Sequence, residues 1–416
     1  MGETTRRTIG PEERRARLAV RHRLAGAARA GTAEEVADSL VALHATDAAT
    51  VFLAVGARLA DAPGGAPDPV AEVERALYGE RVLTRMHGMR HTLFVVPSEL
   101  AAVVHSSSTD AASVRERTTL VKHLTAGSDY DAAWLAETER QVLAELTARG
   151  EATGAELGAA VPRLRAQYVY GVGTNQEGPQ SVASRLLRVL GMEGRIARGR
   201  PQGGWTSSRF RWAPAPPYGE IPRDEAQAEL VRHWLAAYGP ATEADLKWWT
   251  GWKVTDVRRA LAAVGAERVA LEEGTGFVLP DDLDPVPLSV PVGVSPSDEP
   301  WAALLPALDP TPMGWQSRDW YLDPAHRAAL FDRSGNIGPT VWWNGRIVGG
   351  WAQRADGEIV WRLFTGTGKG TDLGKDAGKD AVRAVEAEAA RLAAWVGEVR
   401  ITPRFRTPLE KELSSL

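Results

Sequence analysis

Two polar side chains that could act together on water, His44 and Thr46, lie one residue apart in a short segment between apolar stretches. If this segment is extended, side chains at positions i and i+2 point to the same side of the chain. A neutral imidazole can accept a proton from water, and a threonine hydroxyl can hydrogen-bond the same molecule. The spacing therefore predicts a site that holds one water, although a histidine in an apolar segment is more often a packed core residue.

The elements around this pair follow the order of a winged helix. A first helix is expected over residues 11–30, and a second begins after Thr32, which forms a capping box with Glu35. An apolar helix over 48–59 follows the His-Ala-Thr segment, and residues 81–97 read as two strands around a tight turn. Three helices followed by a two-stranded wing are typical of a winged-helix unit.

The same order of segments recurs twice more. Helices are expected at 130–149, after Thr153, and at 181–190, with strands at 193–197 and 207–212; a third round has helices at 223–238, 243–250 and 254–264, with strands at 268–271 and 276–279. Proline-rich linkers are expected at 214–222 and 285–300. After the second linker, strands at 341–343, 346–353 and 358–364, a helix at 376–396 and a last strand at 398–403 predict a small β-barrel or curled sheet covered by one helix.

The expected fold class is therefore α+β, with tandem winged-helix domains followed by a small β-barrel-like domain. The expected boundaries are 1–125, 126–215, 216–295 and 296–416.

Arginine is concentrated between residues 181 and 212. The stretch has seven arginines and one acidic residue, Glu193, in a chain whose net charge is −4. A helix and wing with this bias suit contact with DNA phosphates, the alternative being an ordinary solvated surface. Arginines 6, 7, 14, 15 and 17 form either a second basic arm or part of a disordered tail. The arginines of the stretch are Arg185, Arg188, Arg195, Arg198, Arg200, Arg209 and Arg211.

Composition excludes several classes of protein. The chain has 416 residues, 44% of them hydrophobic, and no cysteine, so disulfides and thiolate metal sites are excluded. No apolar run is long enough to cross a bilayer, and the charged N-terminal segment lacks the apolar core of a secretion signal, so a cytoplasmic location is expected. The histidines and carboxylates, including His87 and His91 at the first hairpin, lack metal-ligand spacing. No metal or cofactor is expected.

Three longer motifs point to a known family. They are Tyr-Gly-Pro-Ala-Thr-Glu-Ala-Asp-Leu-Lys-Trp-Trp-Thr-Gly-Trp at 238–252, Leu-Leu-Pro-Ala-Leu-Asp-Pro at 304–310 with Gly314 and Arg318 beyond it, and Gly-Arg-Ile-Val-Gly-Gly-Trp at 345–351. With the order of segments, they resemble the YcaQ/AlkZ-like winged-helix DNA glycosylases over nearly the whole chain. His44 and Thr46 occupy the place where that family usually has Gln-x-Gln or Gln-x-Asp. Asp309 is expected to order its loop rather than face DNA, and Arg318 to contact a phosphate or Asp309.

The resemblance implies a monofunctional DNA glycosylase that hydrolyses the N-glycosidic bond of N7-alkylated purines, with His44 and Thr46 as catalytic residues. Its partner would be double-stranded DNA that carries an alkylated or bulky purine adduct, and the protein would act as a monomer. Self-resistance enzymes in the family suggest bulky natural-product guanine adducts or crosslinks as substrates. The alternative is a non-catalytic winged-helix regulator or damage sensor.

Overall fold

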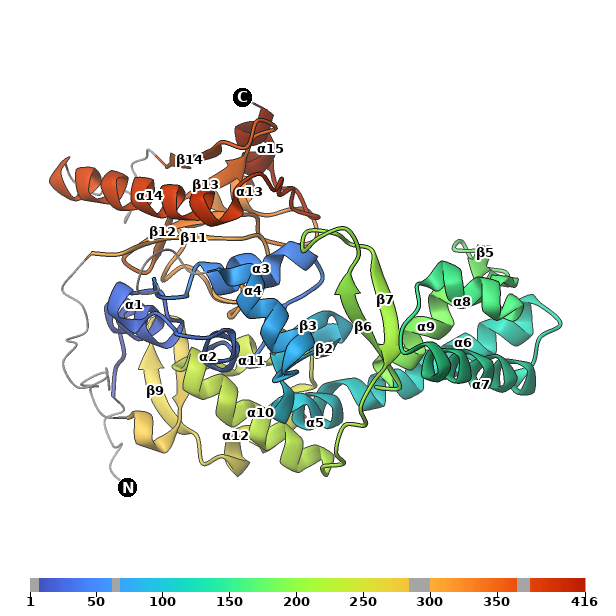
Figure 1. The fold of residues 1–416 in the computed structure, drawn as a ribbon. Helices are drawn as coiled ribbons and strands as arrows, with labels where there is room; N and C mark the ends of the chain where they lie inside the picture. The colour runs from blue at the N-terminus through green and yellow to red at the C-terminus, as the bar shows by residue number, and fades with distance from the viewer. Residues whose placement is uncertain (1–6, 62–67, 284–299, 365–374, 416) are drawn as a thin grey trace, which may run out of the picture.

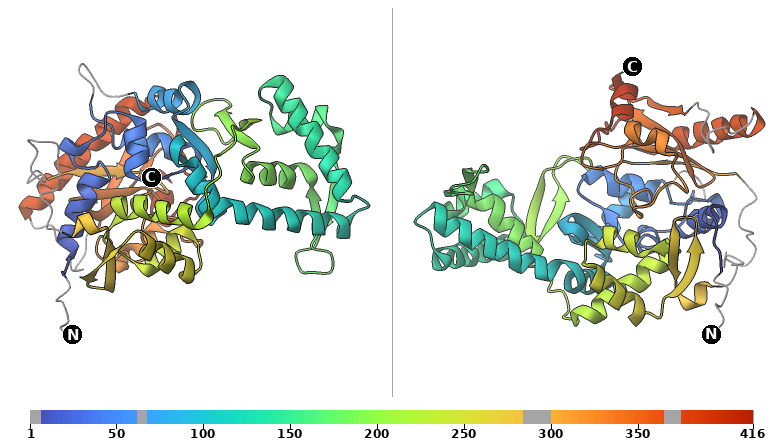
Figure 2. Two further views of the ribbon diagram at one scale, coloured as in Figure 1. Left: turned by 90° about the horizontal axis from the view of Figure 1, so that it is seen from below. Right: turned by 180° about the vertical axis from the view of Figure 1, so that it is seen from behind.

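The computed structural model describes residues 7–61, 68–283, 300–364 and 375–415. Arg6 lies outside the described residues. So does the expected linker at 285–300, except for Pro300. Three units that each combine helices with a small sheet precede a C-terminal four-stranded sheet (Figure 1). The second unit projects from the rest of the molecule at the end of a long helix, as the views from below and behind show (Figure 2).

The first unit places His44 on the outer strand of a sheet. The strand order is β1-β3-β2, and the apolar helix α3 follows β1 directly. Thr32 caps the second helix by accepting a hydrogen bond from the Glu35 N–H (3.2 Å), but the expected capping box does not form because the Glu35 side chain accepts from the Gly31 N–H (3.0 Å) instead. The first helix ends at Arg21, and Arg23 beyond it adopts a left-handed backbone (φ 57°). The elements are α1 (Pro11–Arg21), α2 (Ala33–Ser39), β1 (Leu43–His44), α3 (Ala48–Gly56), α4 (Pro69–Glu74), β2 (Leu83–His87), β3 (Leu93–Pro97) and α5 (Ala101–Val104).

The second unit has a hydrophobic core of its own, built from residues between Leu120 and Trp212. The expected capping box of Thr153 and Glu156 is present. The first helix of the unit and its additional hairpin were not expected from the sequence, because neither has a clear apolar period. The elements are α6 (Asp110–Gly127), α7 (Ala132–Arg149), α8 (Gly154–Ala160), β4 (Gln167–Tyr170), β5 (Gly178–Ser181), α9 (Val182–Met192), β6 (Ile196–Pro201) and β7 (Phe210–Pro214).

The third unit contains the double-tryptophan motif. Thr242 and Asp245 form a capping box at the start of α11, and Gly251 ends that helix in the left-handed conformation (φ 74°). The elements are α10 (Arg223–Tyr238), β8 (Ala241–Thr242), α11 (Glu243–Thr250), α12 (Val254–Ala263), β9 (Glu267–Leu271) and β10 (Gly274–Val278).

The three units share one connectivity. In each, a short extended segment pairs antiparallel with the last strand of the hairpin that follows. The pairs are Leu43 with Val95 in the first unit, Ala152 with Trp212 in the second and Ala241 with Phe277 in the third. The recurrence expected from the order of segments is therefore visible in the strand pairing.

The C-terminal part is an open antiparallel sheet of order β11-β12-β13-β14, so the expected barrel-like closure is wrong for the described residues. Helices pack on the sheet, α14 against β11 and β14 and α15 against β13, so its apolar surface is buried without closure. The elements are β11 (Ala302–Leu305), α13 (Arg327–Leu330), β12 (Thr340–Trp343), β13 (Arg346–Gln353), β14 (Ile359–Leu363), α14 (Lys375–Val396) and α15 (Pro408–Ser415).

The strand expected at 398–403 is also wrong. The side chain of Gln353 binds this segment, accepting from the Ile401 N–H (2.7 Å) and donating to the Val399 carbonyl (3.1 Å). A side-chain amide thus satisfies backbone groups that a neighbouring strand would otherwise pair. The chain then continues into α15, a helix that the sequence analysis did not predict.

The first unit, the third unit and the C-terminal sheet are packed together. One hydrophobic cluster combines Leu18, Trp234 and Trp342, one residue from each part. A fully buried ion pair between Arg58 and Asp309 (2.7 Å) crosses from the first unit to the loop after β11. These contacts fix the wall of the site relative to β1. None of the described helices is long and apolar enough to span a bilayer.

Candidate functional site

His44 and Thr46 line one cavity, although the strand β1 ends at His44 and Thr46 lies in the bend that follows it. Its volume is about 300 Å³, which is within the usual range for sites that take small molecules. The walls come from the first hairpin, from α11 and from the C-terminal part. They are formed by His44, Thr46, Arg90, Thr92, Trp248, Leu308, Met313, Arg318, Phe331, Ser334, Gly335, Asn336 and Phe405.

Backbone pairing on one side and a C-terminal segment on the other hold the His-Ala-Thr segment in place. His44 is paired with Phe94 on β3, and the two rings lie 4.5 Å apart. Beyond the strand, Arg404 donates from Nη1 to the Thr46 carbonyl (3.2 Å) and from its backbone N–H to Asp47 Oδ2 (2.8 Å). The two candidate side chains therefore sit on a backbone that is fixed at both ends.

Both side chains carry a buried polar atom without a protein partner, namely His44 Nδ1 and Thr46 Oγ1. Buried polar atoms are normally satisfied, so two unsatisfied atoms in one cavity indicate a place for water or a ligand. Burial, and to a lesser extent the charge of Arg90, lowers the pKa of His44 to about 3. The imidazole is therefore neutral at physiological pH and can accept a hydrogen bond through one ring nitrogen.

Two arginines in the cavity stack on one tryptophan. The guanidinium of Arg90 lies 4.5 Å from the ring centre of Trp248, and that of Arg318 lies 4.8 Å from it. Arg90 Nε and Arg318 Nη2 are buried and have no partner. The sequence analysis expected Arg318 to contact a phosphate or Asp309 and named neither Arg90 nor Trp248 as a site residue; the available signal for Trp248 was the family motif at 238–252 that contains it.

Asp309 has the structural role expected for it. Both of its carboxylate oxygens accept from Arg58 (2.7 and 2.8 Å), and Oδ1 also accepts from the Thr311 N–H (2.9 Å). The suggested pairing of Arg318 with Asp309 is wrong, because Arg318 instead donates from Nε to the Pro312 carbonyl (3.1 Å). Arg318 therefore keeps its charge without an acidic partner among the described residues.

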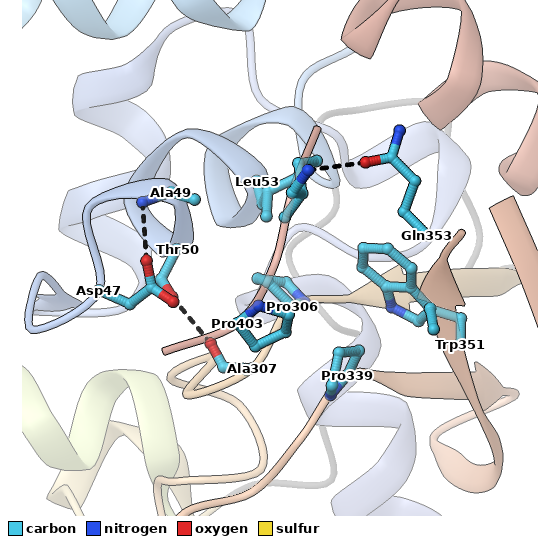
Figure 3. Close-up of a pocket in the computed structure, with 12 residues that line it drawn as sticks. Asp47, Ala49, Thr50, Leu53, Pro306, Ala307, Pro339, Trp351, Gln353 and Pro403 are labelled. Atoms are coloured by element: carbon cyan, nitrogen blue, oxygen red, sulfur yellow. Dashed lines mark hydrogen bonds between the residues drawn. The ribbon is translucent and has the colours of Figure 1, made fainter. Parts of the chain in front are cut away.

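A second, narrow pocket lies behind Asp47 and helps to anchor the site (Figure 3). Asp47 caps α3 by accepting from the Ala49 N–H (3.1 Å), and Thr50 Oγ1 donates to the Ala307 carbonyl (2.9 Å). The pocket measures about 10 Å³, room for no more than a single water. The hydrogen bond of Thr50 connects the start of α3 to the loop after β11.

A cluster of arginines surrounds the contact between the β2-β3 hairpin of the first unit and the β6-β7 hairpin of the second. Strand β2 packs against β6 and α9, and the charges of Arg85, Arg188 and Arg404 all act on Arg198. Burial, followed by the charges of Arg85, Arg404 and Arg188, lowers the pKa of Arg198 to about 10. Arg85 Nε and Nη2 and Arg198 Nε are buried without partners. We refer to Arg85, Arg188, Arg198 and Arg404 as the hairpin cluster.

The remaining arginines of the basic stretch have other surroundings. Arg195 forms an ion pair with Glu139 (2.9 Å), and Arg200 one with Glu74 (3.7 Å). Arg185 stacks on Tyr170 (5.0 Å) and Arg209 is exposed. The structure therefore brings Arg188 and Arg198 together and leaves the other arginines of the stretch outside the hairpin cluster. Arg211 pairs with Glu151 and Glu156.

The described part of the expected basic arm is neither an arm nor a tail. Arg14 and Arg17 are buried in α1 and form ion pairs with Glu273 (2.5 Å) and Asp282 (2.6 Å). Their charges are used to attach α1 to the third unit. His87 is also buried, and it faces Gly191 rather than the cavity. Among the described residues, no group of three or more histidines and carboxylates could hold a metal ion.

Comparison with known proteins gives consistent results. Residues 37–395 match the family model described as DNA glycosylase AlkZ-like. A curated protein of Streptomyces sahachiroi, an interstrand DNA cross-link repair glycosylase, is 30% identical over 196 residues, so the match spans 45% of this chain and about half (48%) of that relative. The solved structure of Streptomyces sahachiroi DNA glycosylase AlkZ has the same fold, with a TM-score of 0.63 over 95% of this chain and 99% of the other at 22% identity. Because the family model covers most of its length, the chain belongs to the AlkZ-like DNA glycosylase family.

Proposed function

We propose that this protein hydrolyses the N-glycosidic bond of N7-alkylated purines in double-stranded DNA. The observation that carries the proposal is the cavity in which His44 Nδ1 and Thr46 Oγ1, at the position of the family's polar motif, are buried without partners. Family membership makes DNA the substrate class. The name of the Streptomyces sahachiroi relative supports repair of interstrand crosslinks as one form of this activity.

The chemistry requires little acid catalysis. Alkylation at N7 makes the guanine positively charged, so the base leaves with the electron pair of the C1′–N9 bond and becomes neutral. Water adds to C1′ of the oxocarbenium-like sugar and loses its proton to solvent. His44, with a pKa of about 3, is too weak a base to store that proton at pH 7. It acts by accepting a hydrogen bond from the water, which Thr46 also holds, so that the oxygen lone pair faces C1′.

The proposed enzyme is monofunctional. A glycosylase that also cuts the DNA strand through a Schiff base needs an amine nucleophile. None of the described residues that line the cavity is a lysine. Water is therefore the nucleophile in this proposal, and the products are the free base and an abasic site.

We further propose that the three units of shared connectivity are winged helices and that the hairpin cluster follows the phosphate backbone of the duplex. The cluster lies where β2 of the first unit meets β6 and α9 of the second, and its Arg404 donates a hydrogen bond to the Thr46 carbonyl. Among the described residues, the guanidinium groups of the cluster form no ion pair with a carboxylate, and this leaves their charges available to phosphates. The protein is proposed to act as a monomer.

A base-release assay tests the proposed activity. In a duplex that contains one N7-methylguanine, we expect the wild-type protein to release the base in a single turnover. His44→Ala and Thr46→Val should each slow release at least tenfold, because each removes one of the groups that hold the water. DNA affinity should change less than threefold, since neither side chain belongs to the hairpin cluster.

Tight binding of damaged DNA without base release would contradict the proposal and favour a regulator or damage sensor. Release by His44→Ala at the wild-type rate would remove His44 from the mechanism.

Bulky natural-product guanine adducts or crosslinks are proposed to be better substrates than the methyl lesion. The described lining of the cavity offers no carboxylate to stabilise the cationic transition state, so more of the rate must come from binding the adduct itself. We expect faster release of a bulky adduct than of a methyl group at the same guanine. Equal or faster release of the methyl lesion would instead indicate a general alkylpurine glycosylase.

A further inference from the structure

The cavity that holds His44 has positive charge but no acid to balance it. Arg90 and Arg318 both line it, and none of its described lining residues is Asp or Glu. The proposed reaction builds positive charge on the sugar. Two guanidiniums near a developing cation raise its energy, especially where little water screens them. The reaction therefore needs a source of negative charge that the described lining of the cavity does not provide.

Both guanidiniums have N–H donors without a hydrogen-bond partner. Arg318 uses Nε for the Pro312 carbonyl (3.1 Å), and its Nη2 is buried without a partner, as is Arg90 Nε. The guanidinium fork matches the oxygens of a phosphate group, and charge-assisted bonds of this kind are strong. Unused donors on two arginines that share one cavity point to an anion as the ligand.

The backbone that positions Arg90 is strained. Arg90 and His91 both have left-handed backbones (φ 53° and 60°), a conformation that costs energy for residues with a side chain. The turn brings Arg90 against the third unit, where a Cβ at Gly251 would lie 3.1 Å from Arg90 Cγ. The indole of Trp248 then contacts both guanidiniums. The double-tryptophan motif thus positions the two charges.

We infer that Arg90 and Arg318 bind the DNA backbone at the phosphates that flank the damaged nucleotide, so that the substrate itself supplies the negative charge that the cavity lacks. This inference rests on the proposed glycosylase function. Phosphate binding neutralises the guanidiniums and places anionic oxygens close to the sugar whose C1′ becomes cationic. Undamaged parts of the duplex have the same phosphates, so this contact contributes to rate more than to recognition of the lesion.

Neutral phosphate analogues test the inference. Three duplexes carry one N7-methylguanine and have a normal backbone, a methylphosphonate 5′ to the lesion, or a methylphosphonate 3′ to it. We expect single-turnover release by the wild-type protein to fall at least tenfold with one or both methylphosphonates. Arg90→Gln combined with Arg318→Gln should be slow on the normal duplex and should no longer distinguish it from the neutral analogues.

Arg258→Gln is the matched control. Arg258 also belongs to the third unit, but it is exposed and paired with Glu243 (2.6 Å). It should keep the wild-type rate and the wild-type discrimination. Arg90→Lys combined with Arg318→Lys keeps the positive charges but removes the forked guanidinium groups. This variant should partly regain the preference for the normal duplex over the methylphosphonate duplexes. It also tests the inference if the glutamine variant does not fold.

Equal release from all three duplexes by the wild-type protein would overturn the inference, as would unchanged discrimination in the double variant. Binding measured on the same duplexes separates this failure from failure of the proposed function. If no base is released from any duplex, the glycosylase proposal fails. In that case, binding still tests the contact. If a methylphosphonate weakens binding by the wild-type protein but not by the double variant, the phosphate contact is supported. If it does not weaken binding by the wild-type protein, the inference is overturned.

Discussion

At the scale of single residues, His44 differs from a solvent-exposed histidine in its proton affinity. Its ring is packed on Phe94, only 6% of the residue is exposed, and burial holds its pKa near 3 instead of about 6.5. The sequence analysis expected a neutral imidazole that accepts a proton from water. With the lowered pKa the imidazole is still neutral, but the mechanism proposed above has His44 orient the water instead of taking its proton.

This difference predicts the pH profile. kcat/KM reports the pKa values of the free enzyme, so it should not change between pH 5.5 and 8 through titration of His44. The sign follows from the lowered pKa, since protonation and loss of activity would begin only as the pH falls toward about 3. An inflection near pH 6.5 in the wild type that His44→Gln removes would contradict this account.

At the scale of elements, the end of α11 controls how the first hairpin meets the third unit. Gly251 has a left-handed backbone, and it leaves room for Arg90. Gly150, at the end of α7, has nearly the same φ (76°) but has no atoms near its missing Cβ. The two glycines therefore separate the backbone requirement from the contact with Arg90.

We expect Gly251→Ala and Gly150→Ala to lower the free energy of unfolding by about 1 kcal/mol or more each, because alanine is strained at positive φ. Only Gly251→Ala should also slow base release, because its methyl group would lie 3.1 Å from Arg90 Cγ and would force that side chain to shift. Thermal unfolding and single-turnover release on the same samples check this. Equal activity of the two variants would mean that the position of Arg90 does not matter.

Sequence patterns predicted most elements whose signal is local. Thr32, Thr153 and Thr242 begin helices because each hydroxyl accepts a backbone hydrogen bond, and this depends only on nearby residues. The segment at 398–403 was misread because its backbone is satisfied by Gln353, a residue some 46 positions away. Arg90 was missed for a similar reason, since its neighbours in the cavity come from α11 and from the loop that follows β11.

At the scale of the whole molecule, the hairpin cluster combines residues of the first unit, the second unit and the C-terminal part. Arg85 and Arg198 belong to different hairpins, and neither unit alone places them side by side. The sequence located the excess of arginine but could not show which members are neutralised. Arg195 and Arg211 have carboxylate partners, whereas Arg188 and Arg198 repel each other.

Salt dependence should separate these two groups. Arg188→Gln with Arg198→Gln should weaken binding to any duplex sequence, and the slope of log affinity against log salt should flatten by about one unit per lost phosphate contact. Arg195→Gln with Arg211→Gln, the matched pair with carboxylate partners, should change the slope much less. Equal slopes for both double variants would show that the cluster is an ordinary solvated surface.

The separate core of the second unit has a consequence for local opening. Residues between Leu120 and Trp212 pack on one another, and the ion pairs of Arg117 with Glu139 and Glu193 lie within the same unit. Such a unit can unfold while the rest stays folded, so its backbone amides should exchange with deuterium earlier than those of β3 and β12. A bound duplex that touches the β2-β3 and β6-β7 hairpins would connect the second unit to the rest of the molecule. Slower exchange across the second unit with DNA present, and unchanged exchange in β12, would identify this region as the movable arm of a clamp.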